Sequence, residues 1–166
     1  MATTMTPRRA LVLIVFVLAA TIAAAWAFEL VGGYVPCPLC LRQRWPYYIA
    51  ILFAGLMLLF ERSPARNRAA LLVIALIMLV STALGVHHAG VEWKWWEGPA
   101  SCASGGGLSG GVPDLATARV VSCGDAQWRF LGLSFAGWNA VISIVVAGFA
   151  AWAARLRPYG SSSASQ

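Results

Sequence analysis

Long uncharged apolar runs dominate the hydropathy pattern of this chain, and short polar segments separate them. The four longest runs are residues 10–28, 45–60, 69–86 and 131–154. A helix needs roughly 20 residues to cross ~30 Å of hydrocarbon. The second run is short for this, so we expect its start to lie in the membrane interface, where Trp45, Tyr47 and Tyr48 join an aromatic belt. The pattern therefore predicts four membrane-spanning helices.

For some residues inside these runs, the sequence also predicts a local structural role. Pro46 is placed in the first turn of its helix, where no N–H donor is needed. Gly55 indicates close packing against a neighbouring helix. Packing is also the expected role of four residues in the last run: Ser134, Trp138, Asn139 and Ser143.

Composition agrees with a chain that lipid surrounds. Of the 166 residues, 60% are hydrophobic and only 11% are charged, whereas soluble domains carry roughly 25% charged residues. The net charge of +6 is compatible with a nucleic-acid partner. The positive residues lie between apolar runs, however, so we expect membrane lipid and no nucleic acid as the environment of this chain.

The positive residues also predict orientation. The N-terminus, the connection at 61–68 and the C-terminus together hold seven arginines and one acid, whereas positive and negative residues balance in the other two connections. The positive-inside rule then predicts an all-α integral membrane protein, a four-transmembrane-helix bundle with both termini cytoplasmic and two outer loops. One membrane domain covers residues 1–154, and residues 155–166 form a cytoplasmic tail that we expect to be disordered.

Two further features qualify this topology. Arg8 and Arg9, followed by an apolar run that ends in a small–Trp–small pattern at 25–27, also resemble a cleavable signal peptide. Cleavage would leave the sidedness of the loops unchanged. In the second outer loop, Trp93, Trp95 and Trp96 indicate a short helix on the membrane surface that carries Cys102 near Cys40.

All four cysteines fall in the two predicted outer loops: Cys37, Cys40, Cys102 and Cys123. Disulfides form and persist outside the cytoplasm. Four cysteines permit three pairings, and the sequence alone does not choose between them. Proximity favours a Cys37–Cys40 pair and a Cys102–Cys123 pair. A glycine-rich run at 104–111 separates the members of the second pair and is typical of a flexible segment.

The Cys-x-x-Cys spacing of Cys37 and Cys40 favours redox chemistry. So small a ring removes little loop-closure entropy, which makes it a poor structural staple. If a helix begins here, Arg44 lies one turn after Cys40, and the helix N-terminus and the guanidinium would both lower the pKa of the Cys40 thiol. A structural disulfide or half a zinc site is the alternative, but zinc usually takes two Cys-x-x-Cys units, so no metal is expected. For the second pair, a staple and a redox relay stay equally open.

The segment at residues 35–44, which reads VPCPLCLRQR, resembles the signature of the disulfide bond formation protein B family, DsbB. Four spans, a cysteine pair in the long outer loop and the stretch at 128–139 extend this resemblance over nearly the whole chain. The resemblance implies a protein-disulfide:quinone oxidoreductase of the bacterial inner membrane, with its active-site loops on the periplasmic side. It would sustain protein disulfide bond formation.

The resemblance also implies a role for each cysteine. A reduced DsbA-like periplasmic thiol oxidase would attack Cys102, and Cys123 would then exchange with Cys37. Cys40, released as a thiolate, would meet the quinone, either ubiquinone or menaquinone. A DsbA-type disulfide has a potential of about −120 mV, so its reoxidation requires a strong electron sink.

Three further residues are candidates for the quinone site. Arg44 matches the arginine of the family's quinone site. A histidine near the outer end of the third span would hydrogen-bond a quinone carbonyl or deliver protons, and His87 and His88 are both candidates. An interfacial position without a redox role is the alternative for either.

Two other functions remain as alternatives. A quinone-linked enzyme of the vitamin K epoxide reductase type uses similar chemistry, but its Cys-x-x-Cys is expected late in the chain, and the order here is reversed. A non-enzymatic membrane scaffold with stapled loops would tolerate Cys37→Ser, which should abolish turnover in an enzyme.

Overall fold

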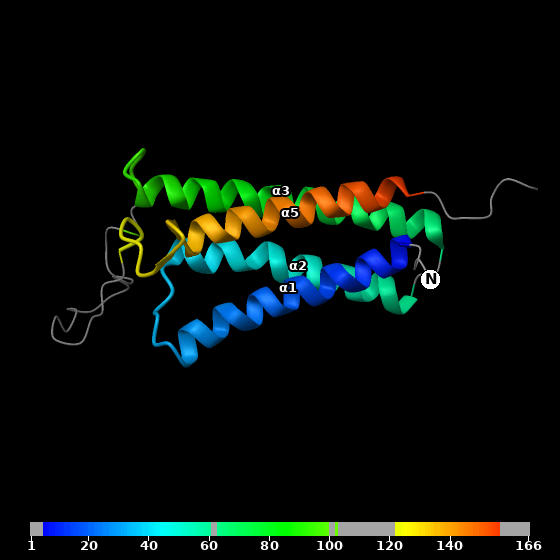
Figure 1. Ribbon diagram of the computed structural model, residues 1–166, viewed down its shortest axis with the longest axis horizontal. Coiled ribbons are helices and arrows are strands. Elements are labelled where there is room, and N and C mark those ends of the chain that lie inside the picture. Colours follow the sequence, from blue (N-terminus) through cyan, green and yellow to red (C-terminus); the bar gives the residue numbers. More distant parts are fainter. Residues whose placement is uncertain (1–4, 61–62, 100–101, 103–121, 157–166) are drawn as a thin grey trace, which may run out of the picture.

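The computed structural model describes residues 5–60, 63–99, 102 and 122–156 of the chain. Within these residues it contains four long helices, packed into one bundle (Figure 1). Their bounds are α1 Pro7–Leu30, α2 Pro38–Phe60, α3 Pro64–Glu92 and α5 Phe135–Arg155. A short antiparallel hairpin, β1 Arg129–Phe130 with β2 Leu133–Ser134, precedes α5. Each of the four helices is long and apolar enough to cross a membrane, which confirms the predicted four-span bundle.

The two ends of the bundle differ in what they carry. The start of α1, the α2–α3 connection and the end of α5 lie together at one end, which we call the basic end (Figure 1). The α1–α2 connection, the end of α3 and the hairpin lie at the other, which we call the cysteine end. This arrangement is the one that the predicted topology requires. Which end faces the cytoplasm stays a prediction from the charge distribution.

Two arginines at the basic end bind helix C-termini. Arg8 donates a hydrogen bond to the carbonyl of Leu58 in the last turn of α2, at 2.9 Å. Arg68 donates to the carbonyl of Leu156, which caps α5. The last carbonyls of a helix lack partners within it, and the negative end of the helix dipole attracts a cation there. Arginines that predicted the orientation therefore also stabilise the ends of two helices.

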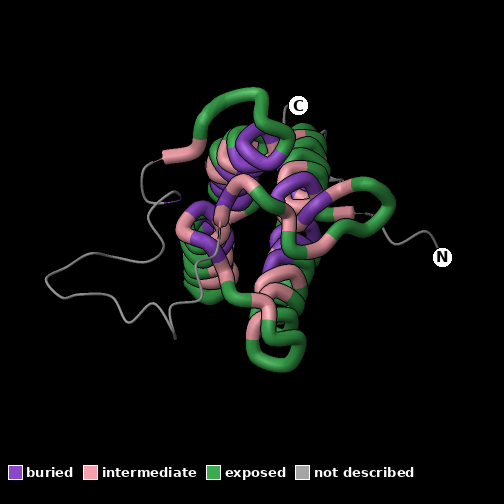
Figure 2. Tube along the Cα trace, turned by 90° about the vertical axis from the view of Figure 1, so that its left-hand side faces the viewer, coloured by how far each residue is buried: buried purple, intermediate pink, exposed green. Residues whose placement is uncertain are grey.

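Alanines make up half of the main buried core cluster between the described helices. Buried alanines occur on all four helices: Ala10, Ala50, Ala54, Ala70, Ala147 and Ala150. A Cβ added to Gly85 of α3 would lie 2.9 Å from the backbone nitrogen of Ala140 in α5. Such close approach is how helices associate in lipid, where burial of apolar surface gives no advantage. The outward faces are exposed, as Figure 2 shows, and this apolar surface suits contact with lipid tails.

Buried hydroxyl groups link three helices through their middle. The Ser143 hydroxyl of α5 donates to the Ser81 hydroxyl of α3 at 2.9 Å, and it lies 3.0 Å from the Tyr47 hydroxyl of α2. The Asn139 amide reaches the Ser81 carbonyl at 3.5 Å. Packing was thus the right expectation for Ser143 and Asn139, with hydrogen bonds added. Ser134 has a different role, because its hydroxyl accepts from the Gly137 N–H and caps α5.

Two local expectations for the second span are wrong. Gly55 makes no close packing contact, because a Cβ added there would meet nothing within 4 Å. Pro46 lies inside α2 and not in its first turn, because the helix begins at Pro38. Hydropathy located the apolar part of this helix but missed the first two turns, which contain Arg42 and Arg44.

The helices also end differently from the apolar runs. α3 continues past residue 86 to Glu92, so both histidines lie within a helix. α5 begins at Phe135, because Leu131 and Gly132 form the turn of the hairpin with φ of 51° and 81°. Positive φ at both central residues is the geometry of tight two-residue hairpin turns. A transmembrane helix has no reason to stop at the hydrocarbon boundary, and hydropathy does not report where it stops.

The predicted surface helix does not form at its three tryptophans. Trp93 is the C-cap of α3, and residues 93–96 form a turn in which Lys94 has a φ of 61°. The glycine-rich run at 104–111 and residues 157–166 of the predicted tail lie outside the described residues. The first two residues of that predicted tail belong to α5, because Arg155 ends the helix and Leu156 caps it.

Replacement of Gly85 by valine should destabilise the bundle, since the new side chain meets the backbone of α5. Overpacking of this kind costs about 1–3 kcal/mol. Gly55→Val is the matched control, because it makes the same helical substitution where the structure leaves room. Thermal unfolding of both variants in detergent checks this. Equal melting temperatures would contradict the close α3–α5 contact.

Candidate active site at the cysteine end

The start of α2 positions the first cysteine pair. The Cys37 carbonyl accepts the first helical hydrogen bond, from the Leu41 N–H at 3.1 Å, and the Cys37 Sγ accepts from the Cys40 N–H at 3.2 Å. A side chain that accepts from the N–H three residues later acts as a helix N-cap. The two Sγ atoms lie 2.8 Å apart as free thiols. The Cys-x-x-Cys spacing therefore corresponds to the cap and the third residue of the helix.

His88 of α3 approaches the same sulfur from the other side. Its Nε2 lies 3.6 Å from the Cys37 Sγ, and its Nδ1 lies 2.6 Å from the Gln43 side-chain nitrogen. Both His88 and Gln43 are buried. An amide donor at Nδ1 leaves the ring proton of a neutral imidazole on Nε2, the nitrogen that faces Cys37. Gln43 thus orients the ring that supports the thiolate.

These contacts favour the thiolate form of Cys37. The hydrogen bond from the Cys40 thiol lowers the pKa of Cys37 below its usual range, and His88 lowers this pKa further, whereas burial opposes both. The sequence instead predicted that Cys40 would receive this stabilisation. The Cys40 thiol is itself the main donor to the Cys37 sulfur, which explains the difference, and the Cys40 backbone N–H adds a smaller contribution through the helix cap.

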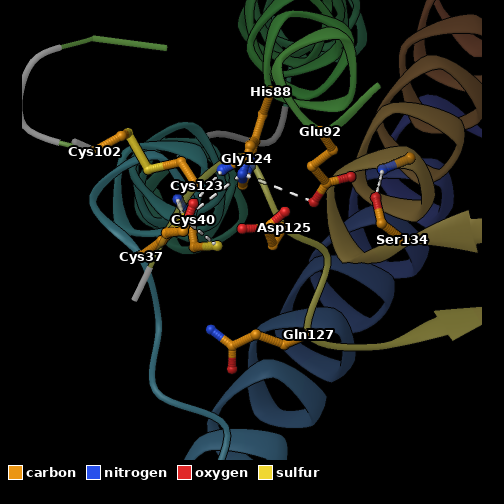
Figure 3. A network of polar contacts seen from close by, with 12 residues as sticks. Cys37, Cys40, His88, Glu92, Cys102, Cys123, Gly124, Asp125, Gln127 and Ser134 are labelled. Atoms are coloured by element: carbon orange, nitrogen blue, oxygen red, sulfur yellow. Dashed lines mark hydrogen bonds and ion pairs between the residues drawn. A yellow bond between two sulfur atoms is a disulfide. The ribbon is translucent and has the colours of Figure 1, made fainter. Parts of the chain in front are cut away.

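Glu92 adds a carboxylate one turn beyond His88. The two side chains project from α3 toward the cysteines, as Figure 3 shows. The Glu92 Oε1 lies 3.8 Å from the His88 Nε2, and the Glu92 side chain is only 5% exposed. Its Oε2 has no hydrogen-bond partner among the described residues. Cys37, Cys40 and His88 also form a cluster whose potential ligand atoms lie within 4.8 Å of one another.

The second cysteine pair forms a disulfide beside the first. Cys102 and Cys123 are bonded, and both pack with Cys37 in one buried apolar cluster. This pairing is one of the three that the sequence left open.

Two hydrogen bonds hold the segment after Cys123 in place. The Gln127 amide donates to the Val35 carbonyl at 2.8 Å, and Lys94 donates to the Gly124 carbonyl at 2.7 Å. The cysteine pairs are therefore adjacent although many residues separate them in the sequence.

A largely apolar cavity of about 410 Å³ opens next to Cys40. Its walls come from α1, α2 and α5 and from residues 122–130, and α3 contributes His88 and Glu92. Most of its polar groups lie at the cysteine end. An aromatic cluster of Phe28, Tyr34, Trp128 and Phe135 lines it, with ring centroids 4.8–5.9 Å apart. α1 diverges from the other helices toward this end (Figure 1). The cavity has the size and the mixed lining of a small-molecule site, for which ~300–1,000 Å³ is typical.

Arg44 lines this cavity, and its guanidinium has partners in α1 that the sequence did not predict. Its Nη1 donates to the Glu29 Oε2 at 2.7 Å, and its guanidinium lies 5.2 Å from the ring centroid of Trp26. Both partners belong to α1. An ion pair and an aromatic face together fix the orientation of a guanidinium. Arg44 is therefore held by α1 while it lines the cavity beside Cys40.

The structure separates the two candidate histidines. His87 is exposed, stacks on Trp96 with ring centroids 5.8 Å apart and accepts the Trp96 indole N–H at its carbonyl. It lies on a different face of α3 from the cysteine cluster. His88 is the histidine at the site, as its contacts with Cys37 and Gln43 show.

Comparison with known proteins places the chain in a family. The family model described as disulfide bond formation protein DsbB matches residues 7–153. This chain belongs to the DsbB family. No solved structure matches it.

Several curated relatives carry the name disulfide bond formation protein B. The protein of Marinobacter nauticus is 33% identical over 147 residues, which cover 82% of this chain and 85% of that protein. That of Nitrosococcus oceani is 30% identical over 148 residues, with 82% and 85% covered. That of Verminephrobacter eiseniae is 28% identical over 144 residues, with 81% and 78% covered. The matches agree with a multi-pass membrane protein of the DsbB family.

Sequence reasoning missed several residues at the site of this DsbB-family protein. Gln43 lies three residues after Cys40 and therefore on the same helical face, a spacing that could have identified it. Glu92 lies four residues after His88, but the relation holds only if α3 extends that far. No sequence pattern could have identified Glu29 and Gln127, because their contacts with Arg44 and Val35 depend on the tertiary fold.

Replacement of His88 by alanine should raise the pKa of Cys37, since it removes a hydrogen-bond partner of the thiolate. The pH profile of Cys37 alkylation in reduced, metal-free protein should then shift to higher pH, because less thiolate is present at each pH. His87→Ala is the matched control and should leave the profile in place. Mass spectrometry of the alkylated peptide reads out both. A profile that His88→Ala does not move would contradict the assigned contact.

Proposed function

We propose that this protein oxidises the reduced dithiol of a DsbA-like periplasmic partner and passes the electrons to a membrane quinone, so that protein disulfide formation can continue. One observation carries the proposal. The Cys102–Cys123 disulfide and the Cys37 and Cys40 thiols share one cluster, and an apolar cavity opens beside it. The loop disulfide can thus oxidise the dithiol of a partner protein, and the helix cysteines can pass the electrons to a lipid-soluble acceptor in the cavity.

The first transfer takes place at the loop disulfide. A thiolate of the partner attacks the Cys102 sulfur, the Cys102–Cys123 bond breaks, and a mixed disulfide forms. The second thiol of the partner then displaces Cys102. The partner leaves with a disulfide, and Cys102 and Cys123 hold the two electrons as thiols.

The second transfer moves these electrons to the helix. The Cys123 thiolate attacks Cys37 of a Cys37–Cys40 disulfide and releases Cys40. Cys102 then attacks Cys123, which restores the loop disulfide and releases Cys37. A thiol of low pKa leaves faster, so the stabilised Cys37 thiolate favours this last step. The structure has the resulting arrangement, with the loop pair bonded and the helix pair reduced.

The cavity residues fit a quinone. A quinone supplies an acceptor for two electrons and two protons, which matches the reoxidation of one dithiol. The apolar lining suits its ring, and the Arg44 guanidinium would hold a carbonyl oxygen by a charge-assisted hydrogen bond. The Nε2–H of His88 is the second donor at this end, oriented by Gln43.

Loss of quinone absorbance on addition of a reduced DsbA-like protein tests the proposal. The purified wild-type protein in detergent should show catalytic loss, and Cys37→Ser and Cys102→Ser should abolish it, since each variant interrupts the electron path. Size-exclusion profiles and helical circular dichroism establish that the variants are folded. No loss with either ubiquinone or menaquinone, from folded wild-type protein, would instead favour the stapled scaffold.

Arg44→Gln should raise the KM for quinone by about ten- to hundred-fold, because a hydrogen bond from a charged group contributes about 1.5–3 kcal/mol. Arg42→Gln is the matched control: Arg42 lies two residues away on α2, is exposed and does not line the cavity. Steady-state kinetics with varied quinone at saturating partner separate the two. Equal KM values would remove Arg44 from the quinone site.

A further inference from the structure

The reduced cysteine pair is surrounded by the donor atoms that a thiophilic cation prefers. Cys37 and Cys40 offer two sulfurs at the start of α2, and His88 offers Nε2 from the last turns of α3. Glu92 follows His88 by four residues, and this spacing places both side chains on one face of the helix. Two sulfurs, an imidazole nitrogen and a carboxylate oxygen are all zinc ligands.

The distances between these atoms can be compared with those of tetrahedral zinc. Zn–S bonds of about 2.3 Å and Zn–N and Zn–O bonds of about 2.0–2.2 Å imply ligand separations of roughly 3.6 Å for S···N, 3.4 Å for N···O and 3.8 Å for S···S. The corresponding separations here are 3.6 Å, 3.8 Å and 2.8 Å. The first already fits. The second is about 0.4 Å too long, and the Glu92 carboxylate lies outside the group of ligand atoms that are within 4.8 Å of one another, so its side chain has to move toward the sulfurs. The third requires the thiols to part by about 1 Å, which rotation of the half-buried Cys40 side chain can supply.

Glu92 gives independent support for a cation. Its side chain is 5% exposed, and its Oε2 has no partner in the part of the chain that the structure describes. A buried carboxylate is costly unless a charge or hydrogen bond compensates it. A divalent cation held by the neighbouring thiolates would provide that compensation.

Gln43 supplies the outer support that such a site needs. Metal-bound histidines usually donate their other ring N–H to a neighbouring group. The Gln43 amide already contacts the His88 Nδ1 at 2.6 Å, and a half-turn of the amide would present its oxygen to an Nδ1–H. Nε2, the nitrogen nearest Cys37, would then be free to bind the metal.

We propose that the reduced protein binds Zn²⁺ through Cys37, Cys40, His88 and Glu92, and that the bound ion inhibits turnover. Two Zn–S bonds form, protons still on the thiols pass to solvent, and no electrons are transferred. The disulfide form lacks both thiolates, so the ion binds only the reduced state. While bound, it blocks reoxidation of the pair.

Titration with Co²⁺ as a spectroscopic probe, followed by displacement with Zn²⁺, tests the site. The full chain carrying Cys102→Ser and Cys123→Ser leaves only one thiol pair, which is reduced and freed of reductant under anaerobic conditions. We expect one ion per chain with thiolate–cobalt charge-transfer absorption, and none in the oxidised protein. Glu92→Gln should weaken binding about ten-fold or more, as His88→Ala should. Asp125→Asn is the matched control, because this acid lines the same cavity but is mostly exposed.

Two outcomes would overturn the site. Absence of stoichiometric binding to the reduced protein is the first. Equal affinity in the parent, Glu92→Gln and His88→Ala is the second, since it would mean that the cysteines alone hold an adventitious ion.

The inhibitory effect rests on the proposed function and is measured separately. Zn²⁺ should slow quinone reduction by the protein with all four cysteines, a chelator should restore the rate, and Glu92→Gln should need about ten-fold more Zn²⁺ for the same fractional loss. Cobalt binding without any quinone reduction would retain the metal site and reject the proposed function. Turnover that Zn²⁺ does not affect would reject the inhibition.

Discussion

The hydrogen bond from the Cys40 N–H to the Cys37 sulfur is the contact on which the rest of the site depends. The first turn of any helix leaves its N–H groups without carbonyl partners, and in a membrane protein such groups must find partners at the helix end. Here the partner is a redox-active sulfur. The same geometry caps α2, brings the two thiols together and directs the positive end of the helix dipole at Cys37. Helix stability and thiolate stability thus share one interaction.

α3 completes the site because it is longer than its apolar run. The helix continues beyond its apolar run to Glu92, and its last turns bring His88 to the cysteines at the start of α2, with Glu92 beside His88. The α3–α5 contact at Gly85 lies one turn below His88 and holds this end of α3 close to α5. Packing of small residues in the bundle therefore determines where a buried imidazole and a buried carboxylate lie. Two charged or polar groups are tolerated there because they face the protein interior and not lipid.

α1 has a different part, which is to hold Arg44. Glu29 and Trp26 contact the guanidinium from the divergent end of α1, next to a cavity lined mainly by α1, α2, α5 and residues 122–130. A cation placed this way is neutralised in part by its own ion pair and keeps further N–H groups for a ligand. Residues of α2 and α3 therefore determine the chemistry of the thiols, whereas α1 and α5 form much of the wall of the cavity beside them.

The sequence by itself determined the class of fold, the pairing of cysteine-bearing loops at one end, and the family. These follow from hydropathy, charge and one short motif, all of which are local along the chain. It also identified Cys37, Cys40 and Arg44 as neighbours, because they share two turns of one helix.

Only the tertiary structure decided that His88 and not His87 contacts Cys37, since adjacent helical residues point about 100° apart and the packing of α3 selects one of them. It likewise decided that Cys37 receives the stabilising hydrogen bonds and that Arg44 pairs with Glu29. Hydropathy could not predict that α2 begins at Pro38 or that α3 continues to Glu92. Capping and packing decide where a helix ends, and neither is visible in the apolar runs.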